Sequence, residues 1–404
     1  MRIFFVAGES SGDAHAAQVV QALKQSPDVN CVGIGGQKMQ EAGAEIIFDA
    51  ARIAVVGFVE VVKHFSDIRS AWKKAVCNLQ AHKPDLLILV DYPGFNLRLA
   101  RVAKKMNIKV LYYISPQIWA WHQSRVKKIK DTVDHMAVIF PFEVSFYEKA
   151  HVPVTYVGSP LAESVLPVGK ETAKKMVSVL GSYPVIGLLP GSRLSEISRL
   201  MPVLVQSAVQ LQAQYPKAEF LIPVASTLRV KNFEPYLKNL DNVRIVENKS
   251  HAVIEACDVV ICSSGTVTLE AAILATPMVL VYKTATITYW IARIVIKIKH
   301  IGLCNILAGR TIIPELIQNQ ATAGNIVSHT RHFLEDVEYR QKTVHELALV
   351  RAQLGNQKTG QNVAELAFRV MKNPVVALGA SGSCCWVMWV CFFVLVCLIG
   401  VILS

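Results

Sequence analysis

The chain has 404 residues, of which 52% are hydrophobic and 18% charged, with a formal net charge of +12 and a mean hydropathy of +0.36. This length exceeds what one hydrophobic core usually organises, which excludes a single small domain and favours two domains. The hydropathy is high for a freely soluble enzyme and indicates contact with a membrane. The positive charge fits nucleic acid, an anionic lipid surface or a phosphorylated substrate, and does not choose among them.

Short apolar runs alternate with helical patterns through the first third of the chain. Strands are expected at 3–7, 30–33, 86–90, 110–114 and 135–140, and helices at 13–25 and 37–42. Strands that alternate with helices predict a parallel, doubly wound sheet. The first apolar run is too short for the core of a signal peptide, so we expect no such peptide.

Polar loops follow two of these runs. Residues 8–13, Gly-Glu-Ser-Ser-Gly-Asp, place two carboxylates and two hydroxyls between a strand and a helix, although Asp13 could instead cap that helix. Asp91 follows the strongly apolar run 86–90, and Pro93 fixes the turn behind it. A carboxylate at such a strand end is well placed to act as a general base, and the alternative for Asp91 is a turn-forming role.

Three further stretches leave alternatives open. Residues 115–122, Ser-Pro-Gln-Ile-Trp-Ala-Trp-His, lead into a basic stretch, which fits stacking on nucleic acid or anchoring at anionic headgroups. His122 could be catalytic or an ordinary surface residue. The apolar stretch 53–59 could line an acyl-chain site or pack in the core. The stretch 286–299 could face a membrane or form a partly buried helix.

The same alternation returns in the second half of the chain. Strands are expected at 185–189, 219–223, 243–246, 259–262 and 278–282, which predicts a second sheet of the same kind. The domain boundary is expected between about 160 and 182. Ligands of such sheets bind outside the carboxyl ends of the strands, so we expect a cleft between two Rossmann-like domains where two substrates meet.

Two loops of the second half are typical of anion sites. They are residues 188–193, Leu-Leu-Pro-Gly-Ser-Arg, and residues 263–270, Ser-Ser-Gly-Thr-Val-Thr-Leu-Glu. Each follows an apolar run and opens a helix, where free N–H groups and the helix dipole favour a phosphate. Arg193 adds a forked cation. Neither loop is a Walker motif or Gly-x-Gly-x-x-Gly, and together they favour a bound nucleotide.

The nine cysteines show no metal-ligand spacing. Four of them lie in the last 21 residues of the chain. The other five are scattered through apolar or helical contexts, where reduced and buried thiols are expected: Cys31, Cys77, Cys257, Cys262 and Cys304.

The C-terminal segment 384–403 contains 20 consecutive residues without a charge. As a helix it would match the hydrocarbon thickness of a bilayer, so we expect it to span a membrane. Arg369 and Lys372 precede it, and the positive-inside tendency then keeps the rest of the chain in the cytoplasm. A buried C-terminal helix and an extension without function are the alternatives.

Several of these motifs occur together in the order found in one known family. The segments are 8–13, 56–61, 91–96, 115–121, 189–193, 264–266 with Glu270, and 305–310. Over about residues 1–370 the chain resembles the lipid-A-disaccharide synthases. The resemblance implies an α/β fold of the GT-B type, with two Rossmann-like doubly wound domains facing a cleft. The implied parts are an acceptor-binding domain at 1–165, a donor-binding domain at 166–345, a helix at 346–374 returning to the first domain, and the hydrophobic tail 375–404.

The activity implied by the resemblance is an inverting glycosyl transfer. UDP-2,3-diacylglucosamine would react with 2,3-diacylglucosamine 1-phosphate to give a β-1′,6-linked disaccharide and UDP, without cofactor or metal. Asp91 would be the general base, with Glu9 and Arg193 beside it in catalysis. Donor contacts would come from Gly191, Ser192, Arg193, Ser264, Gly265, Thr266, Glu270 and Asn305. Contacts to the acceptor or reacting sugar would come from Ser10, Ser11, Gly12, Asp13, Asn96, Gln117 and Trp119.

The other implied partner is the anionic surface at the cytoplasmic face of the bacterial inner membrane, and a homodimer stays open. The family often has His where this chain has Ser159, and it does not explain the tail beyond about residue 374. The alternatives are another UDP-sugar enzyme of this fold, such as a 2-epimerase or a lipid-linked glycosyltransferase of peptidoglycan synthesis, or a nonenzymatic tail-anchored binding protein. No recognised nucleic-acid module accompanies the basic residues, so no nucleic acid is expected.

Overall fold

The computed structural model describes residues 1–372, apart from 54–64, 122–124, 180, 182–183, 226–227, 239, 241, 286–288, 291–292, 294–297 and 356–357. The predicted membrane span 384–403, His122, most of the stretch 53–59 and most of 286–299 therefore lie outside the described residues. Two compact units make up the chain, with Ser164–Gly355 forming unit 2. Unit 1 comprises Met1–Glu163 and the described residues that follow unit 2.

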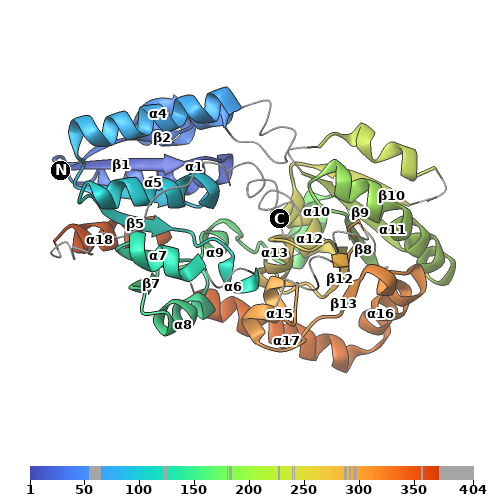
Figure 1. Cartoon of the computed structure of the whole chain (residues 1–404). Helices are drawn as coiled ribbons and strands as arrows, with labels where there is room; N and C mark the ends of the chain where they lie inside the picture. Colours follow the sequence, from blue (N-terminus) through green and yellow to red (C-terminus); the bar gives the residue numbers. More distant parts are fainter. Residues whose placement is uncertain are drawn as a thin grey trace. The chain divides into compact units, whose positions relative to one another are not determined.

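Unit 1 is built on a parallel sheet of seven strands (Figure 1). The strands are β1 (Arg2–Ala7), β2 (Asn30–Gly35), β3 (Glu45–Asp49), β4 (Leu86–Val90), β5 (Lys109–Tyr113), β6 (His135–Val138) and β7 (Val154–Tyr156). The helices are α1 (Ser10–Leu23), α2 (Gln37–Glu41), η1 (Ala50–Arg52), α4 (Phe65–His82), α5 (Pro93–Lys105), α6 (Ile118–Trp121), α7 (Val126–Thr132), α8 (Pro141–Lys149), α9 (Pro160–Ser164) and α18 (Thr359–Lys372). The strand order β3-β2-β1-β4-β5-β6-β7 begins as the Rossmann order and reverses between β1 and β4.

Both faces of this sheet are covered, which explains why β4 is apolar at every position. Helices α4, α5, α7 and α8 contribute buried side chains to the core on one face. Helices α1 and α18 contribute to the core on the other face. A parallel strand covered on both sides needs side chains that can be buried on both sides.

Helix α18 returns to unit 1 after the second unit, and in Figure 1 its red ribbon lies among the blue and teal elements of that unit. It packs on α1, where a Cβ on Gly360 would lie 2.9 Å from the Gln18 backbone. Lys109 of β5 donates from Nζ to the carbonyls of Val370 and Met371 at 3.0 and 2.7 Å. These bonds satisfy acceptors that the end of a helix leaves unpaired.

Unit 2 repeats the arrangement with a parallel sheet of six strands. The strands are β8 (Val185–Leu189), β9 (Glu219–Val224), β10 (Val243–Glu247), β11 (Val259–Cys262), β12 (Met278–Tyr282) and β13 (Glu315–Ile317). The helices are α10 (Lys170–Met176), α11 (Leu194–Gln214), η3 (Val230–Asn232), η4 (Glu234–Tyr236), α12 (Ser250–Ala256), α13 (Val267–Ile273), α15 (Leu303–Ala308), η5 (Gln318–Gln320), α16 (Ala323–Glu335) and α17 (Val337–Leu354). The order β10-β9-β8-β11-β12-β13 reverses between β8 and β11, and α11 and α16 share one core with the sheet.

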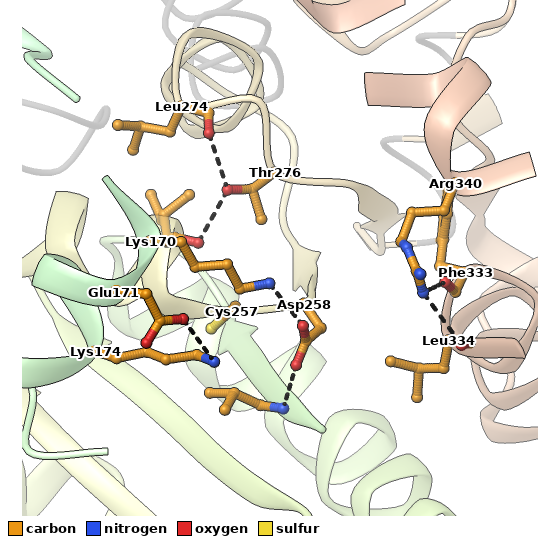
Figure 2. A network of polar contacts seen from close by, with 12 residues as sticks. Lys170, Glu171, Lys174, Cys257, Asp258, Leu274, Thr276, Phe333, Leu334 and Arg340 are labelled. Atoms are coloured by element: carbon orange, nitrogen blue, oxygen red, sulfur yellow. Dashed lines mark hydrogen bonds and ion pairs between the residues drawn. The ribbon is translucent and has the colours of Figure 1, made fainter. Parts of the chain in front are cut away.

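The carboxylates of Asp258 and Glu255 hold α10, the first helix of unit 2, against the rest of the unit. The Asp258 carboxylate accepts from Lys170 Nζ at 2.6 Å and from the backbone N–H of Val185 at 2.8 Å (Figure 2). Glu255 accepts from the backbone N–H groups of Val168 and Gly169 at 3.0 and 2.7 Å. Because these bonds join α10 to the sheet of unit 2, the chain enters this unit before residue 168.

No helix within the described part of the chain combines the length and the apolar character needed to cross a membrane.

Candidate active site

The predicted catalytic residues of unit 1 lie where the strand order reverses. Ala7 of β1 pairs with Val90 of β4, so the loops that follow the two strands begin side by side. Glu9 is in the first of these loops and Asp91 begins the second. Such a reversal opens a crevice at the carboxyl ends of a parallel sheet, which is the usual ligand site of this fold.

The Asp91 backbone adopts an uncommon conformation. Asp91 and Tyr92 both have φ angles of 47°, in the left-handed region that residues other than glycine rarely adopt. The Asp91 backbone forms three hydrogen bonds that hold this turn. The Asp91 carbonyl accepts from Tyr112 Oη at 2.6 Å and from Asn96 Nδ2 at 2.7 Å, and the Asp91 N–H donates to the Tyr113 carbonyl at 3.0 Å. Strain that the surroundings hold in place is characteristic of functional sites.

The surroundings of Asp91 change its acidity. Asp91 remains partly accessible, yet burial of its carboxyl raises the pKa to about 7, with a further increase from the negative charge of Glu9. A hydrogen bond from the Tyr92 backbone lowers the pKa and offsets part of the increase. A carboxylate with a pKa near neutrality can accept a proton from a substrate hydroxyl far better than an ordinary Asp.

Gly8 allows the two loops to touch. A Cβ at this position would lie 2.4 Å from Cδ1 of Tyr92, closer than any real contact. The Tyr92 hydroxyl donates to the Ile53 carbonyl at 3.1 Å, which holds the ring against the β1 loop. Glycine at position 8 is therefore required by the geometry of the Asp91 turn.

Two predicted acceptor residues use their side chains within the protein. Asp13 is buried, and its carboxylate accepts backbone N–H groups at the start of α2, from Gly36 at 2.6 Å and Lys38 at 3.0 Å. Asn96 is buried and donates to the Val90 and Asp91 carbonyls at 3.2 and 2.7 Å. Both residues therefore shape the loops of the site.

The other predicted acceptor residues differ in exposure. Ser10 and Ser11 are exposed in the first turn of α1, whereas Gly12 is buried behind them. Gln117 is exposed, but the Trp119 ring is buried and meets the Phe142 ring edge-on at a centroid distance of 4.8 Å. Ser10, Ser11 and Gln117 can thus reach a ligand, while Trp119 packs against α8.

A buried polar group supports the loop that contains Gln117. The hydroxyls of Ser115 and Tyr147 are 2.6 Å apart, and Glu143 accepts from the Phe140 N–H at 3.1 Å. Burial raises the pKa of Glu143 to about 8, while hydrogen bonds from the Phe140 backbone and from Ser115 act in the opposite direction. At neutral pH this carboxyl is therefore mainly protonated, which suits its dry surroundings.

The paired loops of unit 2 lie at the second reversal of strand order. Leu189 of β8 pairs with Cys262 of β11, so residues 190–193 and 263–266 begin side by side, as the sequence predicted. Gly191 has a φ angle of +113°, and Gly265 one of +149°, which only glycine adopts readily. The two loops therefore have the backbone freedom that close approach to a ligand requires.

One expectation for the first loop is wrong. Its N–H groups are not free, because Glu196 Oε2 accepts from Ser192 N at 2.9 Å and from Arg193 N at 3.2 Å. Arg193 also places its guanidinium 3.7 Å from the other Glu196 oxygen. The loop therefore binds a carboxylate of its own helix, in a capping arrangement with Glu at the third helical position. Phosphate binding by this loop stays a prediction, because Glu196 occupies these donors in the structure.

The second loop is held by side-chain contacts. Ser264 Oγ donates to the Ile301 carbonyl at 3.2 Å, and Thr266 Oγ1 donates to Glu270 at 3.2 Å. Glu270 also lies 3.7 Å from His251 Nε2. Glu270 is only partly buried, so its carboxylate stays accessible at the start of α13.

Asn305 was predicted to contact the donor, but its side-chain polar atoms form hydrogen bonds within the protein. Its Oδ1 accepts from the N–H groups of Ile312 and Ile313 at 2.8 and 3.1 Å. Its Nδ2 donates to the Ile313 carbonyl at 3.0 Å and to Glu315 at 2.7 Å. Asn305 therefore fixes the turn after α15.

Sequence comparison places the chain among known proteins. Residues 3–369 match the family described as lipid-A-disaccharide synthetase. The chain belongs to the lipid-A-disaccharide synthase family. The synthase of Trichlorobacter lovleyi is 46% identical over 374 residues, which are 92% of this chain and 98% of that protein. A Coxiella burnetii synthase is 39% identical over 371 residues, 91% of this chain and 98% of its own length. The prediction of a glycosyltransferase is thus confirmed.

Solved structures show the same fold as this lipid-A-disaccharide synthase family member. The UDP-GlcNAc 2-epimerase of Neisseria meningitidis, bound to UDP-GlcNAc, has a TM-score of 0.61 at 13% identity and matches 92% of this chain and all of its own. The calicheamicin glycosyltransferase CalG4 has a TM-score of 0.55 at 14% identity, covering 92% and 98% of the two chains. At these identities the likeness concerns the fold alone. It confirms the α/β fold of the GT-B type, with two parallel sheets.

The synthase site includes residues that the sequence did not single out. Tyr92 and Tyr112 fix the Asp91 turn, and Glu143 lies beneath the Gln117 loop. Glu196 gave only a partial signal, because it is the Glu of a capping box whose cap position holds Arg193 in place of Ser or Thr. Within the described part of the chain, no group of three His, Cys, Asp or Glu side chains is arranged to hold a metal ion.

Proposed function

We propose that the chain transfers 2,3-diacylglucosamine from UDP to the 6-hydroxyl of 2,3-diacylglucosamine 1-phosphate, giving the β-1′,6-linked disaccharide and UDP. The observation that carries this proposal is the Asp91 carboxyl, raised to a pKa of about 7 beside Glu9 at the strand-order reversal of unit 1. Such a group is deprotonated in a large fraction of molecules at neutral pH and is basic enough to take a hydroxyl proton.

The proposed reaction balances without another reactant. Asp91 accepts the proton of the acceptor hydroxyl as its oxygen forms a bond to the anomeric carbon of the donor sugar. The bond between that carbon and the diphosphate oxygen breaks, and UDP leaves with the bonding electrons. Attack opposite to the leaving group inverts the anomeric configuration.

Unit 2 supplies groups suited to the leaving nucleotide. In the proposal, the loop with Gly191 and Arg193 faces the diphosphate, and the guanidinium offsets the negative charge that develops on UDP. Ser264, Gly265 and Thr266 add a second helix start beside it, and Glu270 accepts from ribose hydroxyls. Because Arg193 contacts Glu196 in this structure, the proposal requires the guanidinium to exchange that carboxylate for the phosphate oxygens of the donor.

The acylated substrates place the reaction at a membrane. We propose that the chain works at the cytoplasmic face of the bacterial inner membrane, supported by the positive net charge and by the uncharged segment 384–403. Cell fractionation of the full chain and of residues 1–374 tests the role of the tail. If both forms resist extraction with salt equally, the tail is not the main anchor.

The activity is tested by incubating purified protein with both lipid substrates and following the products by mass spectrometry. Equal amounts of disaccharide 1-phosphate and UDP are expected. UDP-GlcNAc alone serves as a comparison, because several proteins of this fold are UDP-GlcNAc 2-epimerases. Formation of the 2-epimer without any disaccharide would replace the proposal with epimerase activity.

A further inference from the structure

A buried carboxylate of unit 2 accepts three N–H groups from residues 301–305. Glu315 is the first residue of β13, and its side chain is only 8% exposed. Its Oε2 accepts from the Ile301 N–H at 3.0 Å, and its Oε1 accepts from the Gly302 N–H at 3.0 Å and from Asn305 Nδ2 at 2.7 Å. His300 Nδ1 is 3.9 Å from Oε1, beyond hydrogen-bond distance. Because hydrogen bonds to a carboxylate are stronger than those between neutral groups, Glu315 fixes the turn at 301–302.

The turn at 301–302 packs directly on the sheet of unit 2. Glu315 of β13 pairs with Leu280 of β12. A Cβ on Gly302 would lie 2.9 Å from Leu280 Cδ1 and 3.1 Å from Glu315 Oε1, so the turn has no room to approach more closely. The two strands therefore set the position of this turn, and the hydrogen bonds of Glu315 set its orientation.

The same turn is bonded to the second predicted donor loop, residues 263–266, here called the Ser264 loop. The Ile301 carbonyl accepts from Ser264 Oγ at 3.2 Å. This carbonyl and the Gly302 N–H belong to one peptide group, which is planar and rigid. Glu315 therefore binds one side of that group, and Ser264 binds the other. Ser264 stays partly accessible, and α13 begins directly after its loop. The peptide group thus joins a buried carboxylate to the loop at which a nucleotide is expected.

We propose that Glu315 is a positioning residue for the donor nucleotide, acting through the 301–302 peptide group on Ser264. This inference rests on the proposed function, in which the Ser264 loop contacts the nucleotide. A loop that is already held in its binding conformation loses less conformational entropy when the nucleotide binds, which increases the affinity. Without the Glu315 acceptors, the peptide group can turn and Ser264 loses its fixed partner. UDP should then bind more weakly, although no group in contact with it has changed.

The first test measures the Kd of UDP for the full-length protein by calorimetry. Glu315→Ala removes all three acceptor contacts and should raise this Kd about tenfold. Glu315→Gln keeps an oxygen that can accept from Gly302 and Asn305, so its Kd should stay within about threefold of the native value. An equal loss of UDP affinity in both variants, or no loss in Glu315→Ala, would overturn the proposal.

Glu255→Ala is the matched control within unit 2. Glu255 is 7% exposed, and its two carboxylate oxygens accept from the consecutive backbone N–H groups of Val168 and Gly169. These bonds resemble those of Glu315, but they hold the segment before α10. Glu255→Ala should therefore lower the free energy of unfolding, as Glu315→Ala does, and leave the Kd of UDP unchanged. The same loss of UDP affinity in both variants would indicate a general loosening of unit 2 and overturn the proposal.

A double-mutant cycle tests the connection between Glu315 and Ser264. Ser264→Ala cuts the same connection from the other side, so it should also raise the Kd of UDP. If both changes act through the 301–302 peptide group, the double variant should exceed the larger single effect by no more than about twofold. Single effects that multiply in the double variant would overturn the proposal. If Glu315→Ala does not fold, Glu315→Asp replaces it in the cycle, because the shorter side chain draws the carboxylate away from the turn.

Disaccharide formation by the same proteins separates failure of the inference from failure of the proposed function. Glu315→Ala should raise the KM for the UDP-sugar and leave the KM for the acceptor within about twofold of the native value. Multiplying effects on UDP binding, together with disaccharide from the native protein, would remove the role of Glu315 and leave the proposed function standing. Coupled effects on UDP binding without any disaccharide would leave the role of Glu315 in nucleotide binding and remove the proposed function.

Discussion

Glu9 lies beside Asp91 across the strand-order reversal of unit 1, and its negative charge adds to burial in raising the pKa of the Asp91 carboxyl to about 7. Two like charges at a sheet edge are unfavourable when both are ionised, so one carboxyl keeps its proton to a higher pH. The pair thus makes Asp91 basic enough for proton abstraction near neutrality.

Replacing Glu9 should shift the pH dependence of the reaction. Glu9→Gln removes one negative charge, which lowers the pKa of Asp91 and increases its deprotonated fraction in acid. The ratio of kcat/KM at pH 6 to that at pH 8 should rise roughly twofold to threefold. Asp28→Asn is the control, because Asp28 is an exposed carboxylate distant in sequence from both loops. The same ratio in Glu9→Gln and native protein would contradict this coupling.

Removing the Asp91 carboxyl should stabilise the protein at high pH. The folded-state pKa of about 7 lies above the ordinary value, so protonation favours the folded state and stability falls as pH rises from about 4 to 7. Asp91→Asn lacks this titration, and Asn tolerates a positive φ angle. We therefore compare the free energies of unfolding of Asp91→Asn and native protein by urea denaturation. The value of the variant relative to the native protein should rise by about 1–2 kcal/mol between pH 5 and pH 8. A constant difference at both pH values would show that Asp91 has an ordinary pKa.

Adding one methyl group at Gly8 should damage the Asp91 turn. The Cβ of Gly8→Ala would overlap the Tyr92 ring and push it away, together with the adjacent Asp91. We expect kcat to fall about tenfold to a hundredfold, with a loss of about 1–3 kcal/mol in stability. Gly324→Ala is the control, because a Cβ there meets no atom within 4 Å. If Gly8→Ala keeps full activity, contact between the two loops is unimportant.

A conservative change at Arg193 should affect the donor more than the acceptor. Arg193→Lys keeps the charge but loses the planar fork that matches phosphate oxygens, so the KM for the UDP-sugar should rise about tenfold. The KM for the acceptor should stay within about twofold. Arg229→Lys changes an exposed arginine of the same unit and should be neutral. An equal increase of both KM values would indicate a general disturbance of unit 2.

The sequence predicts the centre of each sheet better than its edges. The strands 86–90 and 185–189 match β4 and β8 at both ends, because strands buried on both faces are continuous apolar runs. The three-residue strands β7 and β13 give no comparable signal and were not predicted. Helix α1 begins at Ser10, three residues before the expected start, since its first turn is polar and resembles a loop.

In the candidate site, too, the sequence predicts residues that follow a strand but misses contacts between separate segments of the chain. Asp91 and the paired loops could be predicted because each directly follows an apolar strand. The engagement of Asp13 with α2 and of Asn305 with the turn before β13 could not be predicted, because these partners come from separate turns of the chain. The packing of α5 against α7 likewise depends on two separate helices, which spacing within one helix does not show.

The most direct test of the account is the pH dependence of disaccharide formation by native protein and by Asp91→Asn. If Asp91 is the base, kcat/KM of the native protein should rise with pH through a midpoint near 7 and then level off. Asp91→Asn should fall by about a hundredfold to ten-thousandfold at pH 8 and lose the midpoint. Unchanged turnover by Asp91→Asn, or the same midpoint in both proteins, would contradict the role of Asp91 as the general base.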